Sequence, residues 1–201
     1  MKQLPHISPL TLTRRREPFD HPDWVFELKH DGFRGVAYIS SGECRLVSRN
    51  GNVFKRFPTL CESLSKLSVK NAVLDGEIIC INGDGVSQFN HLMFRRGVPY
   101  FYAFDLMWLN GHDLRSLRLV ERKEWLKNIV LRADNPVLLY ADYVEQQGVE
   151  FFQIICDKDL EGIVAKHRAS PYDASATWTK IKNPRYTQSE RRHELFESKG
   201  R

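Results

Sequence analysis

Residues 27–34 read Glu-Leu-Lys-His-Asp-Gly-Phe-Arg, and they decide the fold more than any other stretch of the chain. Residues 25–29 alternate apolar and polar side chains, which predicts a strand running into an Asp-Gly turn. On that strand Glu27 and Lys29 share one face, while Phe26 lies on the other. We therefore expect Lys29 to point into a pocket, where its amine can attack a phosphate. The same string also fits a solvated hairpin, because Asp-Gly is a common turn.

Four further segments complete an ordered set of motifs. They read Leu-Asp-Gly-Glu-Ile at 74–78, Tyr-Ala-Phe-Asp-Leu at 102–106, Glu-Gly-Ile-Val-Ala-Lys at 161–166 and Trp-Thr-Lys-Ile-Lys at 178–182. In this order and spacing, the five motifs resemble those of the nucleotidyltransferase domain of ATP-dependent DNA ligases. That superfamily also contains RNA ligases and mRNA-capping guanylyltransferases. The resemblance extends from about Trp24 to about Lys182 and is greatest to the ligase domain of bacterial end-joining ligases.

Periodicity predicts an α+β chain, since strands dominate the first half and helices alternate with strands later. The resemblance implies more: two largely antiparallel sheets with helices outside and a nucleotide cleft between them, the ATP-grasp-like adenylation fold of ligases. Ser87 and Ser116 are the expected helix caps, and Asp75-Gly76 is an expected turn. The expected strands are 25–29, 33–39, 45–48, 73–81, 99–108, 137–140, 163–166 and 178–182, and the expected helices are 58–67, 87–94, 117–132 and 149–157.

The composition is that of a globular protein with a mild excess of positive charge. The 201 residues carry a formal net charge of +5, which is compatible with a polyanionic partner. Basic clusters lie near both ends of the chain and suit either a phosphate backbone or solubilising tails. These clusters contain Arg14, Arg15, Arg16, Arg185, Arg191 and Arg192.

Nothing in the sequence indicates a membrane or an oxidising compartment. No apolar run approaches the ~18 residues that a membrane helix needs, and the first residues lack the apolar core of a signal peptide. The four cysteines show no C-x-x-C spacing, so we expect reduced thiols rather than a zinc site or disulfides. The predicted location is the cytoplasm, with no membrane partner.

Lys29 is the predicted nucleophile, and the resemblance implies that it forms a lysyl-AMP from ATP. Attack requires the neutral amine, so a lysine in this role needs burial or nearby positive charge. Lys180 and Lys182 share a strand face and are expected to supply that charge and to clamp the α-phosphate, with Ile181 in the core between them. A solvated strand face is the alternative for the two lysines.

The resemblance also implies the residues that hold the nucleotide. Phe104 would stack on the adenine, and its alternative is a plain core aromatic. Glu77 would contact the ribose, and Arg34 and Arg49 the ribose and phosphates. Glu161, with Glu77, would hold Mg²⁺ or Mn²⁺ through oxygen ligands. Paired surface acids are the alternative for the two glutamates.

Glu27 bears on the choice of base. A carboxylate accepts a hydrogen bond from adenine N6–H₂, whereas guanine presents an acceptor at that position. The resemblance places an acid here, which favours ATP over GTP and disfavours a capping guanylyltransferase. Lys166, at the end of the Glu161 motif, would face away from Glu161 on a regular strand.

The chain departs from the family pattern after the last motif. It ends 19 residues beyond Lys182, whereas similar ligases continue into an OB-fold of roughly 100 residues. We therefore expect a single adenylation domain over 1–201, with 183–201 as a basic tail and no OB-fold. Self-adenylation would then be slow or would need a partner protein that supplies an OB-fold or an end-joining function.

Three readings of function remain open. The first is an enzyme that forms lysyl-AMP and acts on nicked or broken DNA. The second is a non-catalytic module that keeps a nucleotide pocket inside a repair complex. The third is an RNA ligase, which differs from the first mainly in its substrate.

Overall fold

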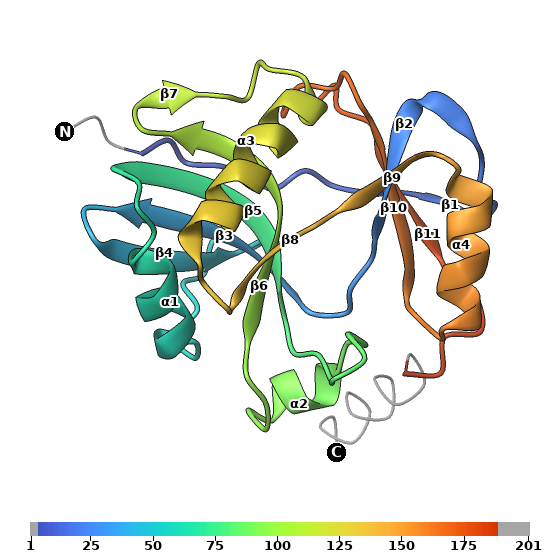
Figure 1. Cartoon of the computed structure of the whole chain (residues 1–201), viewed down its shortest axis with the longest axis horizontal. Coiled ribbons are helices and arrows are strands. Elements are labelled where there is room, and N and C mark those ends of the chain that lie inside the picture. Colours follow the sequence, from blue (N-terminus) through green and yellow to red (C-terminus); the bar gives the residue numbers. More distant parts are fainter. Residues whose placement is uncertain (1–3, 189–201) are drawn as a thin grey trace.

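Two β-sheets form the body of the molecule, and the computed structural model describes residues 4–188 of the chain (Figure 1). The basic positions Arg191 and Arg192, and most of the predicted tail, lie outside this described part. The five-stranded sheet has the order β1 (Thr13–Arg15), β11 (Trp178–Lys182), β10 (Gly162–His167), β2 (His21–Leu28) and β9 (Tyr143–Gln146). The six-stranded sheet runs β4 (Glu43–Ser48), β3 (Phe33–Ser40), β5 (Asn71–Ile79), β6 (Tyr100–Leu109) and β7 (His112–Asp113), with β8 (Leu138–Tyr140) on β6.

The predicted fold class is confirmed. Within residues 4–188 the strand pairs are antiparallel except β1 with β11 and β6 with β8. In the described part of the chain, four helices flank the sheets: α1 (Pro58–Ser65), α2 (Phe89–Met93), α3 (Leu119–Ala133) and α4 (Gly148–Asp157). None of the helices in the described part is long and apolar enough to cross a membrane.

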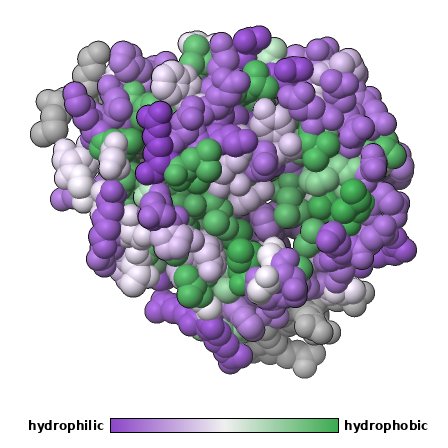
Figure 2. All heavy atoms as spheres, viewed as in Figure 1, coloured by the Kyte–Doolittle hydropathy of each residue, from purple (hydrophilic) through white to green (hydrophobic). Residues whose placement is uncertain are grey.

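Three apolar clusters hold the layers together. The largest lies under α1 and α3 on the six-stranded sheet and includes Leu60, Leu74 and Leu126. A second packs α4 against the back of the five-stranded sheet, around Phe26 and Ile155. The third joins the two sheets and includes Val25 and Trp178 of one sheet and Val36 of the other. Figure 2 shows hydrophobic surface over α4, where Val149 and Ile154 are 45% and 44% exposed.

Both expected serine caps are wrong. Gln88 precedes the first turn of α2, and the Ser87 hydroxyl instead lies 2.8 Å from His30 Nδ1. Arg118 is the N-cap of α3, and its backbone N–H donates to the Glu121 carboxylate at 3.0 Å. A glutamate at the third helical position can satisfy the N-cap amide whatever residue occupies the cap, so serine is not required there.

The Asp-Gly pairs of the first two motifs serve close packing rather than hairpins. The pair at Gly32 lies on the crossover from β2 to β3, which belong to different sheets, so the hairpin alternative is wrong. A Cβ on Gly32 would collide with the carbonyl oxygen of Ile78. Asp75 and Gly76 lie inside β5, not in a turn, and a Cβ on Gly76 would collide with the Phe101 ring. Glycine at both positions lets β5 approach its neighbours closely.

Candidate active site

Lys29 follows β2 directly, at the point where the chain crosses between the sheets. Its backbone N–H donates to the Gly162 carbonyl at 2.9 Å, which holds the crossover against β10. Its Nζ lies 2.6 Å from Glu161 Oε2, and the other oxygen of Glu161 lies 3.2 Å from Lys182 Nζ. Glu161 is 5% exposed, so both ion pairs are shielded from solvent on the carboxylate side. One carboxylate thus fixes two of the predicted catalytic lysines.

The predicted site residues come together around Lys29. A cleft of about 480 Å³ between the two sheets is lined by seven of the predicted residues: Lys29, Arg34, Arg49, Glu77, Glu161, Lys180 and Lys182. A smaller pocket of about 50 Å³ is lined by Glu27, Lys29, Arg34, Glu77 and Phe104. The two hollows share Lys29, Arg34 and Glu77. All nine predicted residues therefore line one continuous site.

Lys180 and Lys182 lie on the same face of β11, as the alternation predicts, and Ile181 between them is fully buried. Burial lowers the pKa of Lys180, and the positive charges of Lys182, Lys29, Arg14 and Arg49 lower it further. An accumulation of cations opposed by few carboxylates is the electrostatic setting that a polyphosphate requires.

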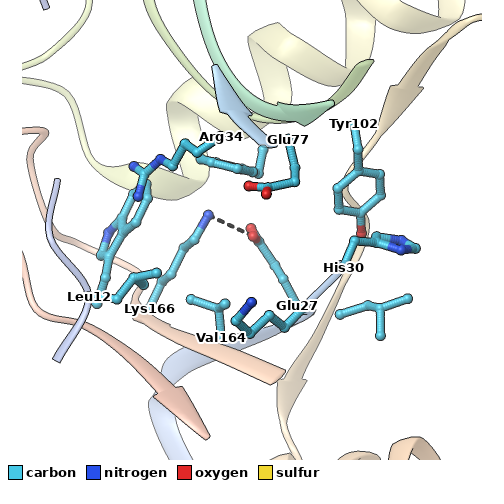
Figure 3. Close-up of a pocket in the computed structure, with 12 residues that line it drawn as sticks. Leu12, Glu27, His30, Arg34, Glu77, Tyr102, Val164 and Lys166 are labelled. Atoms are coloured by element: carbon cyan, nitrogen blue, oxygen red, sulfur yellow. Dashed lines mark ion pairs between the residues drawn. The ribbon is translucent and has the colours of Figure 1, made fainter. Parts of the chain in front are cut away.

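The smaller pocket contains part of an ion triad that the sequence analysis missed. Glu27 is 2% exposed. Its Oε1 lies 2.6 Å from Lys123 Nζ, and its Oε2 lies 2.6 Å from Lys166 Nζ. Figure 3 shows Glu27 and Lys166 meeting below Glu77 and Arg34 of the opposite sheet. The two lysines fix the orientation of the carboxylate.

Lys166 faces the site together with Glu161, contrary to the expectation from a regular strand. Gly162 starts β10 with φ of 144°, a conformation that L side chains rarely adopt, and this interrupts the alternation. After Gly162, Val164 and Lys166 line the smaller pocket, whereas Ile163 packs in the core on the other face of the sheet. Burial lowers the pKa of Lys166 to about 8, against the opposing effect of Glu27.

Lys123 could have been found in the sequence from the pattern of α3. The buried positions of this helix are Leu119, Arg122, Lys123 and Leu126, which have the spacing of a core-facing stripe. Charged residues on such a stripe need buried partners. Arg122 donates to the two carboxylate oxygens of Asp105, at 2.8 Å each. Lys123 pairs with Glu27 and donates to the Ala141 carbonyl at 2.7 Å.

Phe104 lines the smaller pocket. Its ring centroid is 5.9 Å from that of Trp178, and the two ring planes are inclined at 77°. Lys166 Nζ lies 4.4 Å from the Phe104 centroid and 4.0 Å from that of Trp178. Tyr102 lines the same pocket and makes an edge contact of 4.4 Å with His30. The aromatic wall and the lysine suit a flat, electron-rich ring.

Arg34 is positioned by protein groups. Its Nε and Nη2 donate to both oxygens of Asp75 at 3.1 and 2.7 Å, and its Nη1 donates to the Leu10 carbonyl at 2.7 Å. Tyr172 OH also donates to Asp75, at 2.6 Å. Burial alone would lower the pKa of Arg34, but Asp75 outweighs it and the pKa is raised. The guanidinium is therefore a fixed cation at the junction of the two hollows.

Glu77 has the most perturbed carboxyl group of the site. Burial raises its pKa to about 8, although Lys29 and Arg34 oppose the shift, and the charge of Glu161 adds to it. Glu77 and Glu161 are thus close enough to interact electrostatically. No group of three or more His, Cys, Asp or Glu side chains that could hold a metal occurs within residues 4–188. Two carboxylates fit Mg²⁺, which takes its remaining ligands from water and phosphate oxygens.

Comparison with known proteins agrees with this geometry. The family described as "ATP dependent DNA ligase domain" matches residues 12–182. A DNA ligase-like protein, LigB of the SPbeta prophage from Bacillus subtilis strain 168, is 31% identical over 194 residues, covering 90% of this chain and 69% of that protein. The multifunctional non-homologous end joining protein LigD of Pseudomonas aeruginosa is 32% identical over 168 residues, or 80% of this chain. The chain spans only 20% of that longer protein.

A solved structure shows the same arrangement. Mycobacterial DNA ligase D complexed with ATP and MES superposes with a TM-score of 0.76 and 28% identity, covering 87% of this chain and 60% of that one. The two-sheet fold, the ordered motifs and the family match over 12–182 agree with one another. The chain therefore belongs to the ATP-dependent DNA ligases, and it forms their adenylation domain.

Proposed function

We propose that Lys29 is the nucleophile that takes AMP from ATP, and that the chain then passes this AMP to DNA. The observation that carries the proposal is the convergence of nine predicted side chains on one site around Lys29. The ion pair between Lys29 and Glu161 supports it, because a positioned carboxylate beside an amine can accept the proton that nucleophilic attack requires.

The proposed first step transfers AMP from ATP to Lys29. Lys29 Nζ first passes a proton to Glu161 or solvent, then forms a bond to the α-phosphorus of ATP, and it releases a second proton to solvent as the phosphoramidate forms. The bond from that phosphorus to the bridging oxygen of the β-phosphate breaks, and pyrophosphate leaves. Lys180 and Lys182 stabilise the charge on the α-phosphate oxygens, and Arg49 contacts the outer phosphates.

The proposed nucleotide position runs from the smaller pocket of about 50 Å³, which would hold the base, to the cleft of about 480 Å³. Phe104 stacks on adenine and Glu27 accepts from N6–H₂, while Arg34 and Glu77 contact the ribose end. Glu77 and Glu161 would hold Mg²⁺ or Mn²⁺, which supplies positive charge to the phosphates when bound.

In the steps that follow, we propose that AMP passes to a 5′-phosphate of nicked or broken DNA and that a 3′-OH then displaces it. The family match favours DNA over RNA and an enzyme over a non-catalytic module. End-joining relatives support a partner in that process, with residues 1–201 acting as one adenylation unit that carries the basic segment 183–201. The four cysteines are free thiols, which supports a cytoplasmic location.

Intact-mass spectrometry after incubation with ATP and Mg²⁺ tests the nucleophile. The wild-type chain should gain the mass of one AMP, and K29A should gain none. K66A is the matched control, because the Lys66 side chain is 70% exposed on α1. A gain of AMP that persists in K29A would show that another residue is the nucleophile.

A further inference from the structure

Side chains on the cleft face of the five-stranded sheet form a row across its strands, and the edge strand β1 extends this row past Lys180. β1 pairs in parallel with β11, and Arg14 lies directly across from Lys180. Lys180 pairs in turn with Val164 of β10, and Val164 with Glu27 of β2. Residues in cross-strand register project from the same face of a sheet. Arg14 therefore lies on the cleft face, at the outer end of this row.

The row gives Arg14 a defined place relative to the nucleotide. Neighbouring strands are about 4.8 Å apart, so Arg14 lies roughly 14 Å from Glu27 and one strand beyond Lys180. With the base at Glu27 and the α-phosphate at Lys180, Arg14 is past the AMP. Arg14 does not line the cleft of about 480 Å³ that contains Lys29, Lys180 and Lys182.

Arg14 belongs electrostatically to the phosphate-binding end. Its charge is one of those that lower the pKa of Lys180, after burial and the charges of Lys182 and Lys29. Lys29 and Lys182 both pair with the single carboxylate of Glu161. Within residues 4–188, in contrast, no carboxylate lies within ion-pair distance of Arg14 or Lys180. These two cations are available to an anionic ligand.

Room for such a ligand lies next to Arg14. A hollow of about 620 Å³ is lined by Arg14, Arg15 and Arg16, and it shares Glu161 and Lys182 with the cleft. The lining also contains Glu17 and Asp31, so four cationic side chains and three carboxylates face this hollow. The cations outnumber the carboxylates, and a chain of phosphates can pass from the cleft into the hollow alongside them. A nucleic acid strand has that form, whereas the phosphates of ATP fit within the cleft itself.

Arg15 has a different role from its neighbour. Its guanidinium carbon lies 4.2 Å from the centroid of the Phe19 ring, and its Nε donates to the Glu17 carbonyl at 3.0 Å. Alternation along β1 also turns its side chain away from Lys180. Arg14 and Arg15 are both exposed, so substituting either should leave the fold intact.

We propose that Arg14 binds a backbone phosphate of the DNA strand whose 5′-phosphate receives AMP, adjacent to the nucleotide site. This proposal rests on the function proposed above. A single phosphate contact contributes about 0.9 to the slope of the logarithm of the binding constant against the logarithm of salt concentration. The contact is independent of base sequence, because it is made to the backbone.

The test measures equilibrium binding of a labelled nicked duplex to the wild-type chain, R14A, R14K and R45A over a series of salt concentrations. R14A should bind severalfold more weakly at low salt, and its salt slope should be smaller by about 0.9. R14K should retain the wild-type slope, since the charge remains. R45A should match the wild type, because Arg45 is an exposed arginine on β4 that lines neither the cleft nor the hollow.

Two results would overturn the proposal. Equal weakening of nick binding in R14A and R45A would show that the effect reflects only the overall charge of the chain. Wild-type nick binding by R14A together with a lower yield of lysyl-AMP would assign Arg14 to the pyrophosphate of ATP instead. Failure of the proposed function can be told apart from failure of this inference. If the proposed function is wrong, the wild-type chain forms no lysyl-AMP, as measured by mass. The salt slopes of DNA binding are measured without ATP and report on this inference alone.

Discussion

Lys123 Nζ lies 2.6 Å from Glu27 Oε1, and this contact joins helix α3 to strand β2, which Lys29 follows. Both side chains are buried, and the same ammonium donates to the Ala141 carbonyl at 2.7 Å. A residue outside all five motifs therefore orients the carboxylate assigned to base recognition. We expect it to act as a positioning residue, because its side chain does not line the pocket of about 50 Å³ but pairs with Glu27, which does.

Replacing Lys123 with methionine should weaken both the fold and the selectivity for adenine. The change leaves Glu27 with one partner, and breaking a buried ion pair costs roughly 3–5 kcal/mol. Chemical denaturation measures that loss, and competition between ATP and GTP measures selectivity. K127M is the control, since Lys127 is exposed one turn further along α3. Loss of stability with unchanged ATP preference would limit Lys123 to a structural role.

Replacing Phe104 with alanine should weaken nucleotide binding by roughly 1–3 kcal/mol if the ring stacks on adenine. Titration with ATP measures the loss, and circular dichroism verifies the fold. F94A is the matched control, because Phe94 is 43% exposed at the end of α2. An ATP affinity equal to that of the wild type would return Phe104 to the plain core.

Much of the fold and the site was predictable because both depend on local patterns. β11 has the predicted bounds, and Lys180 and Lys182 share its face as alternation requires. The cleft itself followed from the family resemblance, since the crossover at Gly32 looks like a hairpin until its flanking strands are assigned to different sheets.

What the sequence did not predict depends on contacts between distant segments. The short strands β1, β7 and β9 contain two to four residues, too few for a period to emerge. The pairing of Lys123 with Glu27 spans 96 positions, and no local spacing encodes it. Lys166 was placed on the wrong face because a single glycine, Gly162, interrupts the alternation at the start of β10.

Glu77 should make stability depend on pH. Burial raises its pKa to about 8 in the folded chain. Between the usual carboxyl pKa and pH 8, the folded chain therefore keeps a proton on Glu77 that the unfolded chain has released. The contribution is full at low pH and is lost as the pH rises through about 8. The wild type should therefore lose stability relative to E77Q between pH 5 and pH 9, as measured by urea unfolding. E43Q is the exposed control. Parallel pH curves for the wild type and E77Q would contradict the assignment.

Replacing Glu161 with glutamine should slow formation of lysyl-AMP. The neutral amide keeps the shape of the side chain but accepts a proton poorly and holds Lys29 and Lys182 less firmly. Loss of a general base typically costs 10²-fold or more, so we expect a rate reduced by about 10². Quenched-flow mass spectrometry measures the rate across pH and Mg²⁺ concentration. Rescue at high pH would identify Glu161 as the proton acceptor, and rescue at high Mg²⁺ would identify it as a metal ligand. E62Q, at a side chain 70% exposed on α1, is the control. A rate for E161Q equal to that of E62Q would remove Glu161 from the reaction.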